Sequence, residues 1–250
     1  MTTPPAIKLP EMVMTETEKA QRAALSRAVK PRLASTIVLT HGPKDNPKIL
    51  MGQRAKRHDF MPSVFVFPGG RVDRGDSYAA YKGELSPRTE TILEAAYAPR
   101  RARATVLAAI RETYEETGLC LTRDEVPNKS INHPTWSALA DLGQSADLDG
   151  IEVFGRAITP PHRHKRFDTW FFHKHIDDKN LPQASDSTEL LNVDWFTFDE
   201  IEDLKTHRAT DMMLIVLKQF LSYNTAPYDI FFSRMVRGKF QQDHFPTGED

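Results

Sequence analysis

The amino-acid sequence predicts an α/β or α+β fold, in which a mixed β-sheet is covered by helices on both faces. Short runs rich in β-branched and aromatic residues recur along the chain, between residues 34 and 198. Two strong helical patterns, at 104–118 and 211–223, lie among these runs. The strands and helices follow no regular βαβ repetition, which favours a mixed sheet over an all-parallel one.

The composition limits the classes of function that the chain can have. Its 250 residues contain no internal repeat, which predicts one elaborated domain or one domain with extensions. The formal net charge of -1 lacks the basic footprint of a nucleic-acid-binding protein. Cys120 is the one cysteine, so no intrachain disulfide can form, and we expect a reducing, cytoplasmic compartment.

We expect three segments: an N-terminal extension over 1–33, a main domain over 34–225 and a C-terminal tail over 226–250. The extension contains a predicted helix over 15–30 and has neither the charged region nor the apolar region of a secretory signal. The longest apolar run, 212–217, is far shorter than the roughly 20 residues that span a bilayer. The sequence therefore predicts a soluble protein with no membrane partner.

The first half of the chain supplies three strand patterns and one long helix. Residues 77–102 are mixed in charge, broken by prolines and partly helical, so we interpret them as an insertion rather than a core element. The helix over 104–118 has an apolar stripe, and Gly118 suits its C-terminal end. The third strand stops at a diglycine. The predicted strands are 34–42, 48–54 and 63–70.

The second half of the chain adds three more strands and two helices. A helix begins near 199–204, and residues 211–223 are predicted to form a largely buried helix. The last residues, 245–250, are expected to be disordered, and 231–240 to pack on the domain or on a partner. The predicted strands are 151–160, 166–176 and 190–198.

Three glutamates stand close together in the helix over 104–118. Glu112 faces Glu115 and Glu116 at i+3 and i+4, where like charges cost a helix roughly 0.2–0.5 kcal/mol per pair. A divalent cation would neutralise this repulsion, since Mg²⁺ and Mn²⁺ prefer hard oxygen ligands. Arg111 lies about 100° further round the helix, and its planar fork suits a carboxylate. Alone, such a run is more often a solvated helix face, so the rest of the chain decides its meaning.

A glycine-rich loop precedes this helix, in the stretch VFPGGRVDRGD. Gly69 and Gly70 allow the backbone to approach an ion or a phosphate closely. Gly70 and Gly75 have the spacing of a P-loop, but Asp76 occupies the position where that motif requires lysine. The P-loop is therefore excluded, and an acidic residue there suits a metal ion better than a bare phosphate.

The two segments together resemble the signature of the Nudix hydrolase superfamily. Gly70 and Asp76 match its first part, with aspartate in place of glutamate. The gap departs from the pattern, because 34 residues separate Asp76 from Arg111 where the signature has seven, an insertion of 27. Thr113 stands at the first aliphatic position. The second part is matched by Arg111, Glu112, Glu115, Glu116, Gly118 and Leu119.

An interrupted signature resembles one branch of that superfamily, the coenzyme A diphosphatase-like Nudix proteins. Residues 57–70 and 158–172 resemble segments that flank the signature in this branch, and the whole resemblance covers roughly 34–200. It implies a Nudix fold and hydrolysis of the pyrophosphate bond of coenzyme A or acyl-CoA. ADP-ribose, NADH or another nucleotide is an alternative substrate, and a non-catalytic nucleotide-binding module is an alternative function. RNA is the least attractive partner, and a homodimer stays open.

The resemblance also implies metal-binding roles, with Mg²⁺ or Mn²⁺ as the cofactor. Glu115 and Glu116 would ligate the metal, and Glu112 would be a ligand or the general base. Gly70 would offer its carbonyl oxygen. Asp76 would support the helix or belong to the metal shell.

The remaining candidates act on the glutamates or on the substrate. By the same resemblance, Arg111 would orient a glutamate. Glu189 would supply a further carboxylate, although a solvated loop acid is an equal interpretation. Arg54 and Arg166 would hold phosphates, and the basic run 162–166 suits an anionic substrate with an extra phosphate.

Histidines offer a different metal site. His162 and His164 are two residues apart, as are His173 and His175, so on a strand each pair would project to one face. Four histidines would suit zinc or nickel. Histidines that merely lie at the surface are the simpler interpretation.

Overall fold

The computed structural model describes residues 14–16, 20, 29–55, 63–124, 133–161, 163–177, 183–223 and 229–246. The helix expected over 15–30 falls largely outside these ranges. The helices are η1 (Arg74–Tyr78), α2 (Pro87–Glu94), α3 (Pro99–Thr117), α4 (Pro134–Asp141), α5 (Phe198–Glu202) and α6 (Arg208–Ser222). The main-sheet strands are β1 (Arg32–His41), β2 (Lys48–Arg54), β3 (Phe65–Val66), β4 (Gly69–Arg71), β8 (Glu152–Ile158), β9 (Phe167–Ile176), β10 (Leu190–Phe196), β11 (Ile230–Val236) and β12 (Lys239–Phe245).

Nine strands of the described residues form one mixed sheet, in the order β10-β2-β1-β9-β8-β11-β12, with β3 on β2 and β4 on β1. The long strand β1 is parallel to β9 along its whole length, whereas β2 and β4 pair with it in the antiparallel sense. A second, three-stranded sheet contains β5 (Tyr81–Lys82), β7 (Gln144–Asp147) and β6 (Thr122–Asp124). The mixed sheet confirms the predicted fold class.

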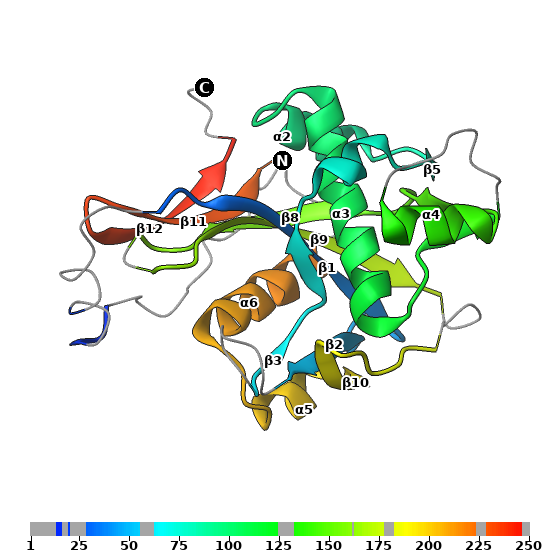
Figure 1. The fold of residues 1–250 in the computed structure, drawn as a ribbon. Helices are drawn as coiled ribbons and strands as arrows, with labels where there is room; N and C mark the ends of the chain where they lie inside the picture. Colours follow the sequence, from blue (N-terminus) through cyan, green and yellow to red (C-terminus); the bar gives the residue numbers. More distant parts are fainter. Residues whose placement is uncertain are drawn as a thin grey trace.

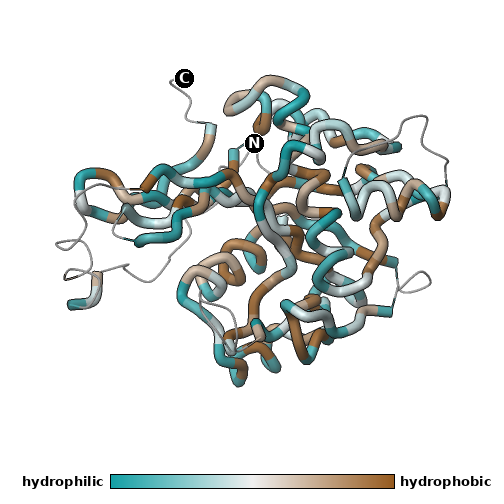
Figure 2. The backbone as a smooth tube through the Cα atoms, in the orientation of Figure 1, coloured by the Kyte–Doolittle hydropathy of each residue, from teal (hydrophilic) through white to brown (hydrophobic). Residues whose placement is uncertain are grey.

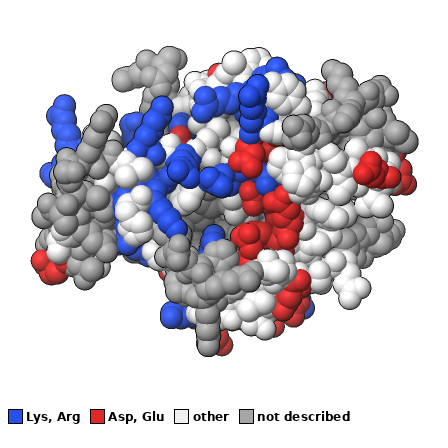
Figure 3. All heavy atoms as spheres, in the orientation of Figure 1, with Lys and Arg blue, Asp and Glu red and all other residues white. Residues whose placement is uncertain are grey.

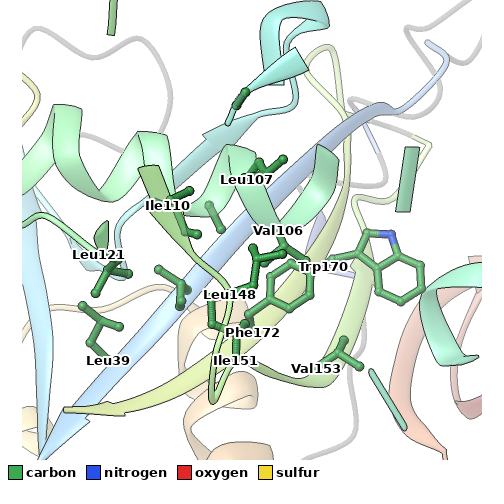
Figure 4. Close-up of a cluster of buried hydrophobic side chains, with 14 of the residues drawn as sticks. Leu39, Val106, Leu107, Ile110, Leu121, Leu148, Ile151, Val153, Trp170 and Phe172 are labelled. Atoms are coloured by element: carbon green, nitrogen blue, oxygen red, sulfur yellow. The ribbon is translucent and has the colours of Figure 1, made fainter. Parts of the chain in front are cut away.

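Helices cover both faces of the main sheet, as predicted (Figure 1). Alternate residues of β1 face opposite sides, so Ile37 packs in the core beneath α3 while Val38 packs in the core beneath α6. On the α3 side, Val106 and Ile110 lie with the aromatic rings of β9 (Figure 4). The most hydrophobic stretches of the backbone accordingly lie where helices meet strands (Figure 2).

The segment 77–102 contributes to the core, which corrects the expectation that it forms no core element. It supplies β5, α2 and the first turn of α3, and Ile92 and Leu93 of α2 have no exposed surface. Its polar groups find partners on β8: Arg88 donates to the carbonyl of Val153 at 2.7 Å, and Thr89 donates to Glu152 at 2.8 Å. Its apolar residues and Arg88 therefore dock on the sheet, whereas most of its other charged side chains are exposed.

The segment expected to form a C-terminal tail is instead a hairpin that widens the main sheet. β11 pairs in parallel with β8, and Arg237 and Gly238 turn the chain with φ angles of 49° and 85°. The hairpin escaped prediction because this two-residue turn lacks the usual Asn-Gly or Asp-Gly pair. Phe245, expected to be disordered, ends β12 and contacts the ring of Trp170 at 5.7 Å.

The predicted strand over 63–70 is divided into two short ones. β3 ends at Val66, and the diglycine does not stop a strand but begins β4, where Gly70 pairs with Ser35 of β1. Of the helices in the described part of the chain, none is long and apolar enough to cross a membrane.

Candidate active site

The helix α3 carries the three glutamates across β1 and β4. It begins at Pro99, a residue whose fixed φ angle suits the first helical position. It ends at Gly118, whose φ of 69° lies in the left-handed region and whose N–H donates to the carbonyl of Tyr114 at 2.8 Å. The C-terminal end was predicted, whereas the helix begins five residues before the predicted start at 104, and the glutamates lie in its last two turns.

Arg111 lies at the centre of the cluster and is 2% exposed. Its Nε and Nη2 atoms donate to the two oxygens of Asp76 at 2.8 and 3.1 Å. Nη2 also donates to the carbonyl of Arg71 at 2.8 Å. Nη1 donates to Glu112 at 2.9 Å and to Glu115 at 2.8 Å. All five guanidinium N–H donors are therefore used, which fixes the orientation of the side chain.

Asp76 is fully buried and joins the two halves of the split motif. Besides the bonds from Arg111, its Oδ2 accepts from the backbone N–H of Asp73 at 2.7 Å. Its Oδ1 accepts from the indole N–H of Trp136 at 2.8 Å. Both oxygens are therefore engaged within the protein. This geometry favours the helix-supporting role over the metal-binding role that the sequence also suggested.

The glycine loop meets α3 at Glu116 and Glu112. The backbone N–H of Gly69 donates to Oε2 of Glu116 at 2.8 Å. A Cβ atom on Gly70 would lie 2.4 Å from the carboxyl carbon of Glu112, so only glycine fits at this position. The two glutamates and the diglycine are thus brought together as predicted.

Glu115 is oriented differently from the other two glutamates. Its side chain is 34% exposed, against 16% for Glu112. One oxygen accepts from Arg111 and the other from the hydroxyl of Thr135 in α4. Glu115 therefore bridges α3 to α4, whereas the other two face the glycine loop.

Burial strongly perturbs two of the carboxyl groups. It raises the pKa of Glu112 to about 7, although the charge of Arg111 opposes the shift. It raises the pKa of Glu116 to about 8, against the N–H of Gly69 and the charge of Arg54. The surroundings of these two carboxyl groups therefore supply little positive charge to stabilise their ionised forms. A cation beside them would lower both pKa values.

Arg54 and Glu189 join this cluster from β2 and from the loop before β10. Arg54 pairs with Leu190 in the ladder, and the backbone N–H of Ala55 donates to the carbonyl of Glu189 at 3.0 Å. Their charges act on Glu116, because Arg54 lowers its pKa and Glu189 raises it. The Nε atom of Arg54 is buried and donates to no hydrogen-bond acceptor in the described part of the chain.

Arg166 does not lie with these groups. Its guanidinium donates to the carbonyls of Thr159 and Val29 at 2.8 and 2.6 Å, which gives it a role in holding the backbone. His162, in the same basic run, lies outside the described residues. Figure 3 shows the acidic side chains gathered over α3, beside a part of the same face where Lys and Arg side chains gather.

The two histidines of β9 hydrogen-bond to the neighbouring strand β1. His173 and His175 project to one face, as expected, and both contact the hydroxyl of Thr40, at 2.9 and 3.1 Å. Burial lowers the pKa of His173 to about 3. Its ring lies 5.8 Å from that of Phe220 in α6. These contacts leave His173 within the core beneath α6.

The glutamate cluster has the donor chemistry for Mg²⁺ or Mn²⁺. Across the ranges that the structure covers, no three His, Cys, Asp or Glu side chains converge closely enough to form a ready metal cage. Arg111 binds one oxygen each of Glu112 and Glu115. Among the described residues, the other oxygen of Glu112 and one oxygen of Glu116 accept no hydrogen bond. Hard carboxylate oxygens of this kind fit either ion.

Three residues of this site escaped the sequence analysis: His133, Thr135 and Trp136. They lie at the start of α4, and His133 packs against Gly75, where an added Cβ would lie 2.8 Å from the imidazole. No spacing rule connects them to the signature. A tryptophan in a sequence is normally interpreted as a core residue, and Trp136 is indeed only 3% exposed.

Comparison with solved structures places this arrangement among known folds. A crystal structure of a Nudix hydrolase from Alicyclobacillus acidocaldarius is 26% identical, with a TM-score of 0.58 over 77% of this chain and 91% of that chain. The chain has the Nudix fold. A curated Caenorhabditis elegans protein that carries the name nudix hydrolase 7 is 25% identical over 182 residues. These likenesses support the Nudix hydrolase superfamily.

The match to the curated protein is partial. It covers 69% of this chain and 53% of the relative, so the chain spans about half the length of that relative. No protein-family model matches the chain.

Proposed function

We propose that this Nudix protein is a divalent-metal-dependent hydrolase that cleaves the pyrophosphate bond of a nucleoside diphosphate-linked small molecule. The observation that carries the proposal is the charge balance at α3. Three carboxylates, those of Asp76, Glu112 and Glu115, share the guanidinium of Arg111. A fourth, that of Glu116, lies within electrostatic reach of Glu112, Glu189 and the guanidinium of Arg54. A site with this excess of buried negative charge attracts a cation and, through it, the oxygens of a phosphate.

We propose that Glu112 and Glu116 hold Mg²⁺ or Mn²⁺, together with Glu115 and the carbonyl of Gly70. When bound, such an ion neutralises the charge that develops on phosphate oxygens. The cluster is buried on the α3 side, where such neutralisation is worth more than in water. The carbonyl role of Gly70 is supported by the absence of a side chain between its backbone and Glu112.

Side chains of the protein would hold the metal ligands in place and accept the proton of the attacking water. Arg111 holds Glu112 and Glu115 while Asp76 holds Arg111, so Asp76 acts through the guanidinium rather than on the metal. A general base works best when its pKa lies near the working pH. Burial raises the pKa of Glu112 to about 7 before a cation binds, and an ion would lower it from there. Where Glu112 does not ligate the ion, it is our candidate to deprotonate the attacking water. Glu189, whose charge reaches Glu116, is a second candidate.

The substrate would be held by Arg54. Its buried Nε donor has no partner in the described residues, and a phosphate oxygen would satisfy it. We assign Arg166 no phosphate contact, because backbone carbonyls bind it. Coenzyme A or acyl-CoA is the first substrate to test, and this choice rests on the resemblance of the flanking segments to that branch. The exposed, unpaired Cys120 supports a cytoplasmic location.

The test is a product analysis with purified protein and Mg²⁺ or Mn²⁺. The panel contains coenzyme A, acyl-CoA, NADH, ADP-ribose, a dinucleoside polyphosphate and a nucleoside triphosphate, and mass spectrometry identifies the products. Release of 3′,5′-ADP with phosphopantetheine supports the proposed substrate. Cleavage of another pyrophosphate keeps the reaction and rejects coenzyme A. Binding of a nucleotide without turnover, seen by calorimetry, would reject hydrolysis in favour of a binding module.

A further inference from the structure

The first turn of α4 reaches the glutamate cluster from outside both halves of the signature. The indole N–H of Trp136 donates to Oδ1 of Asp76 at 2.8 Å, and these side chains are 3% and 0% exposed. The hydroxyl of the preceding residue, Thr135, donates to Oε1 of Glu115. Two consecutive residues of α4 therefore contact two different carboxylates of the cluster.

These contacts restrain the guanidinium at the centre of the site. Oδ1 of Asp76 accepts from both Arg111 and Trp136, so the indole fixes the carboxylate that in turn fixes Arg111. The other end of the guanidinium holds Glu112 and Glu115. A tilt of the Asp76 carboxylate would therefore move both glutamates. Thr135 restrains Glu115 a second time, from the opposite oxygen.

We propose that Trp136 and Thr135 are positioning residues, which hold the α3 carboxylates in the arrangement that binds a divalent cation. This inference rests on the metal site of the proposed function and adds two residues to it. Thr135 hydrogen-bonds to a proposed metal ligand, and residues in such positions typically change metal affinity 10- to 100-fold when they are altered. Trp136 acts further out, through Asp76 and Arg111, so we expect an effect at the lower end of this range. Both residues act through Asp76, Arg111 or Glu115, so neither needs to touch the substrate.

The first experiment removes the indole donor and keeps an aromatic ring. Trp136→Phe is compared with Trp170→Phe, a matched control. Trp170 is also fully buried, and its indole N–H donates to the hydroxyl of Tyr97 at 3.2 Å, away from the cluster. Both variants lose a buried N–H donor. The readout is Mn²⁺ binding without substrate, measured by electron paramagnetic resonance of the free ion.

We expect the dissociation constant for Mn²⁺ to rise about 10-fold in Trp136→Phe and to stay within about twofold in Trp170→Phe. A metal titration of kcat should show the same shift. Equal Mn²⁺ affinity in both variants and the parent would overturn the role of Trp136. Unfolding curves show how much of each variant is folded, so that loss of stability is not mistaken for loss of affinity.

The second experiment tests Thr135 with a pair of variants. Thr135→Val keeps the shape and removes the hydroxyl, whereas Thr135→Ser keeps the hydroxyl. We expect weaker Mn²⁺ binding in the valine variant, by about 10-fold, and recovery in the serine variant. Equal binding by the two variants would overturn the role of the hydroxyl.

The two proposals fail in different ways. If the parent binds Mn²⁺ with an affinity that depends on Thr135 and Trp136 but hydrolyses nothing in the panel, the positioning role stands and the proposed reaction falls. If the parent hydrolyses a pyrophosphate while every variant binds Mn²⁺ like the parent, the reaction stands and the positioning role falls. Absence of Mn²⁺ binding in the parent overturns both.

Discussion

At the scale of a single residue, the burial of Glu116 lowers the stability of the metal-free protein at neutral pH in a position where the side chain would bind a metal ion. The residue is 4% exposed, and burial raises its pKa to about 8. In the unfolded chain a glutamate ionises near pH 4.3. The group therefore favours the folded state when protonated, fully below about pH 4. That contribution is lost as the pH rises through the folded-state pKa of about 8.

We therefore expect Glu116→Gln to lower the rate of metal-dependent hydrolysis at least about 100-fold. The same change should stabilise the metal-free protein at pH 8 to 9. An amide has no charge to bury and can still accept the N–H of Gly69. Turnover of the best substrate and the thermal midpoint in EDTA are the measurements. Glu94→Gln, at an exposed position of α2, is the control. Near-parental turnover of Glu116→Gln would reject the assignment of this residue.

The residues of the signature were predictable because their chemistry is local. Arg111 and the glutamates lie on one helix, and helical spacing alone sets their relative positions. The resemblance suggested a supporting role for Asp76 but not its ion pair with Arg111, because the two residues lie far apart in the sequence. The sequence likewise gave no sign that the carbonyls of Thr159 and Val29 bind Arg166.

At the scale of the elements, the hairpin of β11 and β12 is held to the sheet around one partly buried cation, the guanidinium of Arg156. The guanidinium of Arg156 lies 4.8 Å from the ring of Phe232 and 5.1 Å from that of Phe245. Asp168 accepts from the same guanidinium at 2.9 and 2.8 Å. The ring of Trp170 lies 4.7 Å from it. The hairpin is thus anchored by cation–π contacts as well as by its ladder.

Phe232 is 4% exposed, so Phe232→Ala should lower the free energy of unfolding by roughly 3 kcal/mol. Hydrolysis per folded molecule should stay unchanged, because β8 and β9 separate the hairpin from β1 and the cluster. Urea denaturation measures the first effect, and kcat at a temperature where the variant is folded measures the second. Phe240→Ala, on the half-buried side of β12, should cost much less. A similar cost for both would mean that the Arg156 contacts do not anchor the hairpin.

Long elements were predicted well and short ones poorly. The boundaries of β2 and β9 and the C-terminal end of α3 follow from dense apolar patterns and from the cap at Gly118, whereas the start of α3 was predicted five residues too late. The strands β5 and β6 have two and three residues, too few for any periodicity to show. The start of α4 contributes to the site through Trp136, yet its distance from the signature in the sequence gave no sign of this.

At the scale of the whole molecule, His173 should make the protein sensitive to acid. Burial lowers its pKa to about 3, whereas an unfolded histidine titrates near 6.5. Between these values the unfolded chain binds more protons, so stability is present above about pH 6.5 and falls as the pH decreases. The predicted slope is about 1.4 kcal/mol per pH unit below that value.

His173→Gln should remove much of this slope, because an amide does not titrate and can still bond with Thr40. The measurement is the free energy of unfolding in urea at pH 7, 6, 5 and 4, for the parent and the variant. The buried glutamates act in the opposite sense in both proteins, so the difference between the two isolates His173. His244→Gln, in the half-exposed end of β12, serves as the control. Parallel pH profiles of the His173 variant and the parent would contradict the prediction.

The edge strand β12 also affects the association of one molecule with another. Within the described residues β12 pairs with β11 alone and so forms one edge of the sheet. An edge strand offers free N–H and C=O groups to any other strand, which is a common route to aggregation. β12 reads KFQQDHF, with charges at Lys239 and Asp243, polar side chains at Gln241 and Gln242, and a half-buried ring at Phe240. The two charges oppose pairing of this edge with a second copy, so we expect concentrated solutions of the protein to stay clear.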